Sequence, residues 1–387
     1  MPHLGVLFCG SWKAKLVVDG GMDRMSLIYV REIARLHSRM RTSFLTSPYS
    51  HGAVRIGLLR CADGRMRSFN RAMNIQPGML FEMRAIGAKK DMASYPFRDR
   101  LVDWLGQGGR HYAMLLTYHF DCETPSLGCA GHGYDTQAAR DAQVELAHDI
   151  KVGFRNRIHP IVAGYDTRLE EVVLHGEGGQ TMRTSEIGDN RHQAMSSLIG
   201  LFPSIPMDIL EQLIPLLLHN AQHVESNIGA GARTLIRDHQ EVGVVIGRRV
   251  GWITDDPDAL HAAIIEDTTL HPHTEISVGI QLLQSNLVAG RIPRDQGTFV
   301  MTCIPYFRKQ DMKEASEVAA RRWALMARQL VAKNAPEIAS YITYLLAVIC
   351  EDTRELTLLE GPPGARELFH RELVTVPTNG CGDTLVA

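Results

Sequence analysis

The sequence predicts an α/β protein with a parallel-rich sheet that helices cover on both faces. Short apolar runs typical of buried strands recur along the first half of the chain. Longer stretches between them carry apolar residues at helical spacing. Strands that alternate with helices in this way are typical of parallel sheets whose connections pack over both faces.

The first elements follow in chain order. Apolar positions at helical spacing predict a helix over residues 24–40, and the apolar run Val54–Leu59 predicts a buried strand that ends at Cys61. The turn-prone pair Pro77-Gly78 introduces a second strand over Met79–Met83. A helix over Phe97–Leu105 is expected to stop at the glycines that follow it.

A third strand is predicted over Tyr112–Tyr118, immediately before His119. Asp135 or Thr136 can cap a helix that runs to about Val152, and Ile158–Val162 closes this half as a fourth strand. Because such sheets gather their chemistry at the carboxyl ends of strands, Cys61 and His119 are expected to be neighbours in space.

The second half is predicted to repeat this plan. A strand over Gly297–Tyr306 and a long helix over Met312–Ala332 resemble Tyr112–His119 and its helix. Val242–Ile246 resembles the strand before Cys61, but Arg248 follows it instead of a cysteine. The join is expected near Gly176–Gly179, and the second copy is expected to have lost its ligands.

Composition sets further expectations. A formal net charge of −2 favours neither a nucleic acid nor an anionic membrane as partner. The apolar runs Ile209–Leu218 and Ile338–Cys350 are shorter than the ~20 residues of a membrane span, so both are predicted to be buried helices. Seven cysteines, an odd number, form no disulfide framework, and without a recognisable signal peptide the expected location is the cytoplasm.

Two sequence segments carry candidate metal chemistry. In Cys61-Ala62-Asp63-Gly64-Arg65 the aspartate can accept a hydrogen bond from a metal-bound water, and the arginine can hold that carboxylate. His119 is followed by Cys122 and, in the segment Gly128–Gly133, by Cys129. Three cysteine and histidine ligands with an open position are typical of catalytic zinc.

The order of these segments resembles that of the beta-class carbonic anhydrases. Cysteine, any residue, aspartate, any residue and arginine precede a histidine and a cysteine, as in that family. Between them, Pro77–Gly87 resembles the family's strand that runs into an arginine and small residues, and after the last helix Ile161–Asp166 resembles the strand and turn that close its core. Gly128–Gly133 and the ligand-poor second half resemble the carboxysomal branch. The likeness covers residues 30–175, although the long N-terminal region of that branch is missing.

The resemblance implies a fold and a set of roles. It implies a beta-carbonic-anhydrase-like sheet covered by helices, with a degenerate second copy in the same chain. Cys61 and His119 are expected to bind Zn²⁺ together with Cys129, because the glycines and alanine around Cys129 also match the carboxysomal branch. Cys122, which matches the general family spacing, is the alternative third ligand. Asp63 and Arg65 are the expected catalytic pair. The predicted domains are an extension at 1–25, the zinc-binding catalytic domain at 26–175 and the degenerate repeat at 176–387.

The implied activity is the reversible hydration of carbon dioxide to bicarbonate and a proton by a zinc-bound hydroxide. Since the family places its site where two core copies pair, a homo-oligomer is expected, either a dimer or a multiple of dimers. Location in a carboxysome, with carboxysome components as partners, is the alternative to the cytoplasm. Two other functions stay open: a zinc-binding structural or assembly protein without activity, and a related zinc hydrolase for carbon disulfide or carbonyl sulfide.

Overall fold

The computed structural model describes residues 22–46, 54–75, 79–106, 108–229, 241–247, 250, 253, 260–266, 272–306, 312–351 and 353–375. Most of the predicted N-terminal extension, the Pro77-Gly78 turn and Arg248 lie outside the described residues. Among the helices that are described, none is both long enough and apolar enough to cross a lipid bilayer.

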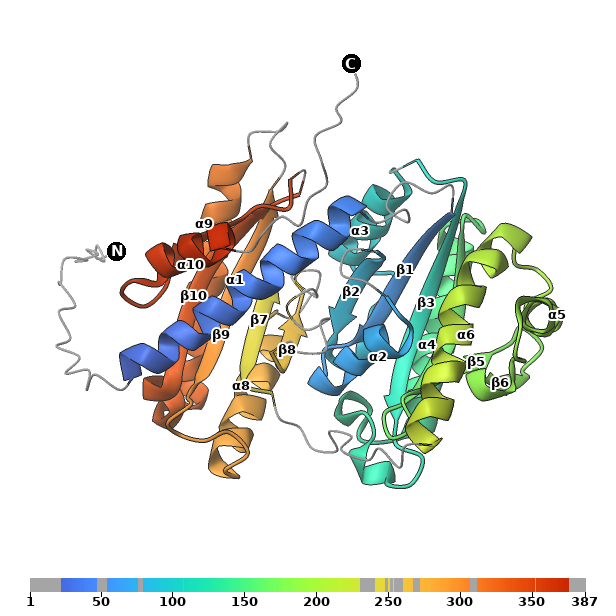
Figure 1. Ribbon diagram of the computed structural model, residues 1–387, viewed down its shortest axis with the longest axis horizontal. Helices are drawn as coiled ribbons and strands as arrows, with labels where there is room; N and C mark the ends of the chain where they lie inside the picture. Colours follow the sequence, from blue (N-terminus) through green and yellow to red (C-terminus); the bar gives the residue numbers. More distant parts are fainter. Residues whose placement is uncertain are drawn as a thin grey trace, which may run out of the picture.

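The chain forms two mixed sheets that helices cover on both faces, which confirms the predicted α/β class (Figure 1). The first sheet has the order β2-β1-β3-β4-β5-β6, and its strands are β1 Val54–Cys61, β2 Phe81–Ala85, β3 His111–Phe120, β4 Ile158–Asp166, β5 Glu171–His175 and β6 Thr181–Arg183. The second sheet has the order β11-β10-β9-β7-β8, and its strands are β7 Gly243–Gly247, β8 Ala262–Ile265, β9 Thr298–Tyr306, β10 Ile342–Cys350 and β11 Leu356–Glu360.

Strand order and direction correspond between the two sheets. From β2 to β4 all neighbours in the first sheet are parallel, and β5 then runs antiparallel to β4. From β8 through β7 and β9 to β10 all neighbours are again parallel, and β11 then runs antiparallel to β10. The edge strands β2 and β8 contact each other, so the two sheets meet at corresponding edges.

Nine helices cover the sheets within the described residues: α1 Met22–Thr46, α2 Arg67–Ala72, α3 Tyr95–Leu105, α4 Thr136–Gly153, α5 Arg191–Leu201, α6 Met207–Gly229, α8 Pro272–Val288, α9 Lys313–Asn334 and α10 Ala365–Thr375. On the first sheet, α2, α5 and α6 share one apolar core, and α3 and α4 form the core on the opposite face. On the second sheet, α1 and α10 cover one face, and α8 and α9 cover the other.

Two of these helices each precede a sheet in chain order, and they differ in which sheet they cover. Helix α1 precedes the first sheet in the chain but packs on the second, where Tyr29 donates a hydrogen bond to the Gly297 carbonyl at 2.9 Å and its ring contacts Phe299. Helix α6 precedes the second sheet but packs on the first, where the Asn220 carbonyl oxygen accepts a hydrogen bond from the Val172 amide at 2.9 Å. In Figure 1, α1 lies in blue across β7 and β9, while α6 covers β3. The second sheet therefore depends on a helix that precedes the first sheet in the chain, whereas α6 stays with the sheet that it follows.

The packing of α5 and α6 shows where the halves divide. Gly176–Gly179, the expected join, forms the turn between β5 and β6, which pair in the first sheet. Helices α5 and α6 then pack on that same sheet. The chain changes sheet only after α6, later than the predicted boundary between residues 175 and 176.

Each strand and helix predicted in the first half is observed, although α1 runs to Thr46 instead of residue 40 and β5 and β6 follow the strand expected to close this half. Asp135 caps α4 by accepting a hydrogen bond from the Ala138 amide. The run Ile209–Leu218 lies in a buried helix as expected. The helix predicted over Ile338–Cys350 was wrong, because residues 342–350 form β10, which pairs with both β9 and β11. A short continuous apolar run has no period that distinguishes a buried strand from a buried helix.

Helix α1 should contribute strongly to the stability of the second half. Ile33 of α1 is 1% exposed in the second core, whereas Ile28 on the same helix is 45% exposed. We expect Ile33→Ala to destabilise the fold by about 2–5 kcal/mol, since it leaves a cavity against the sheet. Ile28→Ala should change stability by less than about 0.5 kcal/mol. Urea denaturation curves of the two variants test this, and equal midpoints would contradict the packing of α1.

Candidate metal centre

Three potential metal ligands meet at one edge of the first sheet. The sulfur atoms of Cys61 and Cys129 and one ring nitrogen of His119 all lie within 4.8 Å of one another. The two sulfur atoms are 3.9 Å apart, and all three side chains are buried. A compact buried group of two thiols and an imidazole could bind a metal ion.

Strand topology brings the first two ligands together. Cys61 is the last residue of β1, and His119 is the last but one of β3. These strands are parallel neighbours, so their carboxyl ends lie side by side as the sequence predicted.

The third ligand comes from the loop after β3. Asp121 folds the start of this loop, because its Oδ1 accepts hydrogen bonds from the Glu123 and Thr124 amides at 3.0 and 2.6 Å. The chain then returns, and Cys129 stands at the start of a short 3₁₀ turn, Ala130–His132. The alternative ligand, Cys122, is exposed and lies outside the group. The structure therefore brings Cys129, and not Cys122, to Cys61 and His119.

Two glycines let the loop approach the sheet. A Cβ atom on Gly131 would lie 2.7 Å from the Cα atom of Gly87, in the turn after β2. Gly87 has a φ of +66°, which residues with side chains rarely adopt. The Gly87 amide donates to the Cys61 sulfur at 3.2 Å, and its carbonyl lies 2.9 Å from His132 Nε2. The His132 side chain thus holds the loop against the sheet.

The hydrogen-bonding state of His119 supports a metal-binding role. The residue is fully buried, and within the described part of the chain neither ring nitrogen makes a hydrogen bond. Leaving a buried donor or acceptor unsatisfied costs about 1–3 kcal/mol. A metal ion would satisfy one of the nitrogens, so the residues present fit such an ion.

The hydrogen bond between the two cysteines shifts their pKa values in opposite directions, and burial adds to the raised pKa of Cys61. Their hydrogen bond lowers the pKa of Cys129, because a thiolate accepts a hydrogen bond better than a thiol does. The thiolate is the form that binds metal. One of the two sulfur ligands therefore ionises more readily than an ordinary cysteine.

Beside this group lies a buried ion pair. Arg65 Nε donates to Asp63 Oδ1 at 3.0 Å, and Arg65 Nη2 donates to Asp63 Oδ2 at 2.7 Å. Burial lowers the pKa of Arg65, but the negative groups around it, Asp63 foremost, together raise it by more, so the net pKa is above its usual value. Asp63 Oδ2 is 3.5 Å from His119 Nε2. All five residues expected at the site therefore lie together.

Arg65 also joins the two loops of the site. Its guanidinium donates to the carbonyls of Leu127 and Gly128, immediately before Cys129. Four hydrogen bonds from one side chain therefore fix Asp63 and the loop that carries the third ligand. A lysine could not replace it, because only a guanidinium presents donors in this planar arrangement.

Sequence analysis missed one residue that reaches the site from the second half. Glu241, just before β7, is fully buried and accepts a hydrogen bond from the Gly64 amide at 2.9 Å. It belongs to no local motif, and 177 positions separate it from Gly64. Only the three-dimensional fold reveals the contact.

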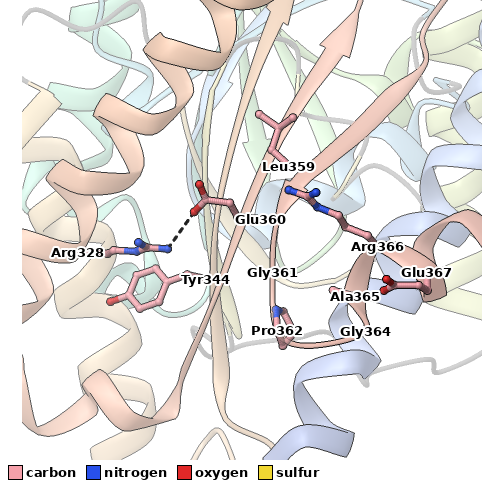
Figure 2. A pocket seen from close by; sticks show the side chains of 10 residues that line it. All are labelled: Arg328, Tyr344, Leu359, Glu360, Gly361, Pro362, Gly364, Ala365, Arg366 and Glu367. Atoms are coloured by element: carbon pink, nitrogen blue, oxygen red, sulfur yellow. Dashed lines mark ion pairs between the residues drawn. The ribbon is translucent and has the colours of Figure 1, made fainter. Parts of the chain in front are cut away.

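A separate hollow of about 420 Å³ lies in the second half, between α9, β10, β11 and α10 (Figure 2). The Arg328 guanidinium lies 5.0 Å from the centre of the Tyr344 ring and 3.7 Å from the Glu360 carboxylate. No residue predicted for the site lines this hollow. The hollow is therefore distinct from the metal centre.

Comparisons of the chain with models of known protein families and with curated proteins find no match.

Substitution of each cysteine tests the ligand set. Cys61→Ser and Cys129→Ser should weaken zinc binding by more than about 100-fold, because loss of a ligand costs more than loss of a group that merely orients one. Cys122→Ser is the matched control and should keep about one zinc per chain. Competition with a chromophoric chelator measures the affinities. Loss of zinc from Cys122→Ser with retention in Cys129→Ser would contradict the site.

The contact between the two glycines yields a second prediction. Gly131→Ala should weaken zinc binding by about 10-fold or more, because the new methyl group would push the Cys129 loop away from Gly87. Gly200→Ala is the control, since a Cβ atom there meets nothing within 4 Å. Equal zinc affinities for the two variants would show that the close approach is unimportant.

Proposed function

We propose that this chain is a zinc-dependent carbonic anhydrase of the beta class, which interconverts carbon dioxide and water with bicarbonate and a proton. One observation carries the proposal: a carboxylate held by an arginine lies against a buried group of two cysteines and a histidine. This donor set matches catalytic zinc with three protein ligands. A zinc ion bound there would supply hydroxide at neutral pH, since zinc lowers the pKa of water to about 7.

Asp63 is the proposed orienting acceptor. Its carboxylate can accept a hydrogen bond from the attacking hydroxyl group and so direct the oxygen lone pair toward carbon dioxide. Arg65 binds both carboxylate oxygens and its own amide donates to Oδ1 at 2.9 Å, which prevents the Asp63 side chain from rotating. Bidentate pairing with a guanidinium also favours the ionised carboxylate.

The ligand count supports a catalytic site over a purely structural one. Structural zinc sites are almost always closed by four protein ligands. Within the described residues the group contains three, and the remaining nearby cysteine, Cys122, is exposed. A structural role would also leave the buried pair of Asp63 and Arg65 unexplained.

The second half is proposed to be a degenerate copy of the first. The shared strand order and directions support this relationship. In the first half β1 ends at Cys61, whereas its counterpart β7 ends at Gly247. Within the described residues, the group at Cys61 is the only one of its kind. We propose that this copy takes the place of a partner subunit, so that one chain contains the pair of cores.

The activity is tested with zinc-loaded protein in a stopped-flow assay that follows proton release from carbon dioxide. We expect hydration by the wild type and a loss of roughly 10²-fold or more in kcat/KM for Asp63→Asn, because the carboxylate acceptor is removed. Cys122→Ser should keep its activity. Zinc binding without hydration by the wild type, or full activity in Asp63→Asn, would contradict the proposal.

A further inference from the structure

We propose that Glu241 is a positioning residue for the Asp63–Arg65 pair, so that the second half controls the geometry of the site in the first half. The catalytic part of this inference rests on the proposed function. The structural part, which concerns the shape of the metal site, does not depend on that function.

The second half holds the chain on both sides of Asp63. Before it, the Ala62 carbonyl accepts a hydrogen bond from the Ile264 amide of β8 at 3.3 Å. After it, the Gly64 amide donates to Glu241 Oε1 at 2.9 Å. These two bonds fix the backbone at Asp63 relative to the second sheet, and Arg65 then sets the direction of the carboxylate.

Glu241 is itself held in place from the second half. Its backbone carbonyl accepts a hydrogen bond from Asn286 Nδ2 at 3.2 Å, and Oε2 lies 3.4 Å from the same atom. Asn286 is fully buried in α8, where its side-chain oxygen accepts from Arg291 at 3.2 Å. The carboxylate is therefore a fixed acceptor and not a mobile side chain.

The site is built to accommodate this carboxylate. A Cβ atom on Gly64 would lie 3.0 Å from Glu241 Oε1, so the absence of a side chain there permits the contact. Glu241 also contributes, after Asp63, to the raised pKa of Arg65. A buried carboxylate is costly unless it is paired and hydrogen-bonded. The hydrogen bond from the Gly64 amide and the nearby positive charge of Arg65 offset the cost of burying the Glu241 carboxylate.

A merely structural contact between the halves would affect stability alone. A positioning role must also change the metal's surroundings while all three ligands remain. Visible absorption of the cobalt-substituted protein reports on those surroundings, independently of carbon dioxide hydration. The test therefore measures, for each variant, both the absorption spectrum of the cobalt-substituted protein and kcat/KM for hydration.

Three variants decide the question. Glu241→Asp keeps the charge but withdraws the carboxylate by about one C–C bond length, ~1.5 Å. Glu241→Ala removes it, and Glu241→Gln keeps the acceptor at its full reach. Glu314→Gln, at an exposed position on α9, is the control.

We expect the aspartate and alanine variants to bind about one cobalt ion per chain. Their visible absorption spectra should differ from that of the wild type, and their kcat/KM should be lower by about 10-fold or more. The glutamine variant should lie closer to the wild type. An unchanged spectrum in the aspartate variant would overturn the proposal, even if the alanine variant fails to fold. A glutamine variant as disturbed as the aspartate variant would also overturn it. If the wild type binds cobalt but hydrates no carbon dioxide, the proposed function fails while the spectra still test the positioning role.

Discussion

The site depends on a histidine that is buried without hydrogen bonds. Neither nitrogen of His119 makes a hydrogen bond among the described residues, and the polar groups beside it are the two thiols and the Asp63 carboxylate. Folding must meet the cost of this arrangement, about 1–3 kcal/mol for each unsatisfied group. The surrounding features bring the ligands together: parallel strand ends, the contact of Gly131 with Gly87, and the hydrogen bonds of Arg65 to the returning loop. A metal ion would convert this cost into binding free energy, which couples metal binding to folding.

Helix α1 ties the second sheet to the start of the chain. The second sheet buries apolar residues of α1, which precedes the first sheet, whereas α2 to α6, which cover the first sheet, lie within or directly after it in the chain. The edge strands β2 and β8 then contact each other beside the candidate site. The described residues of the second half contain no metal-binding group of their own. Through this contact, however, Glu241 and the Ile264 amide of the second half bind the loop around Asp63 in the first half.

Much of the first half could be predicted because its signals are local. Buried strands, a capping aspartate and the spacing of Cys61, Asp63 and Arg65 are all visible in short windows of sequence. The choice between Cys122 and Cys129 could not be made from spacing alone, because the turn at Asp121 decides which sulfur faces inward. The strand β10 was mistaken for a helix because its apolar run has no period. Glu241 and the packing of α1 on the second sheet remained hidden, since both depend on contacts between residues far apart in the chain.

X-ray absorption at the zinc edge of the loaded protein tests the central claim most directly, because it counts the sulfur atoms bound to the metal. The account predicts two sulfur ligands, from Cys61 and Cys129, with nitrogen and oxygen in the remaining positions. Three sulfur ligands would indicate a closed structural site that includes a further cysteine. A spectrum without sulfur ligands would place the metal elsewhere in the chain and contradict the account.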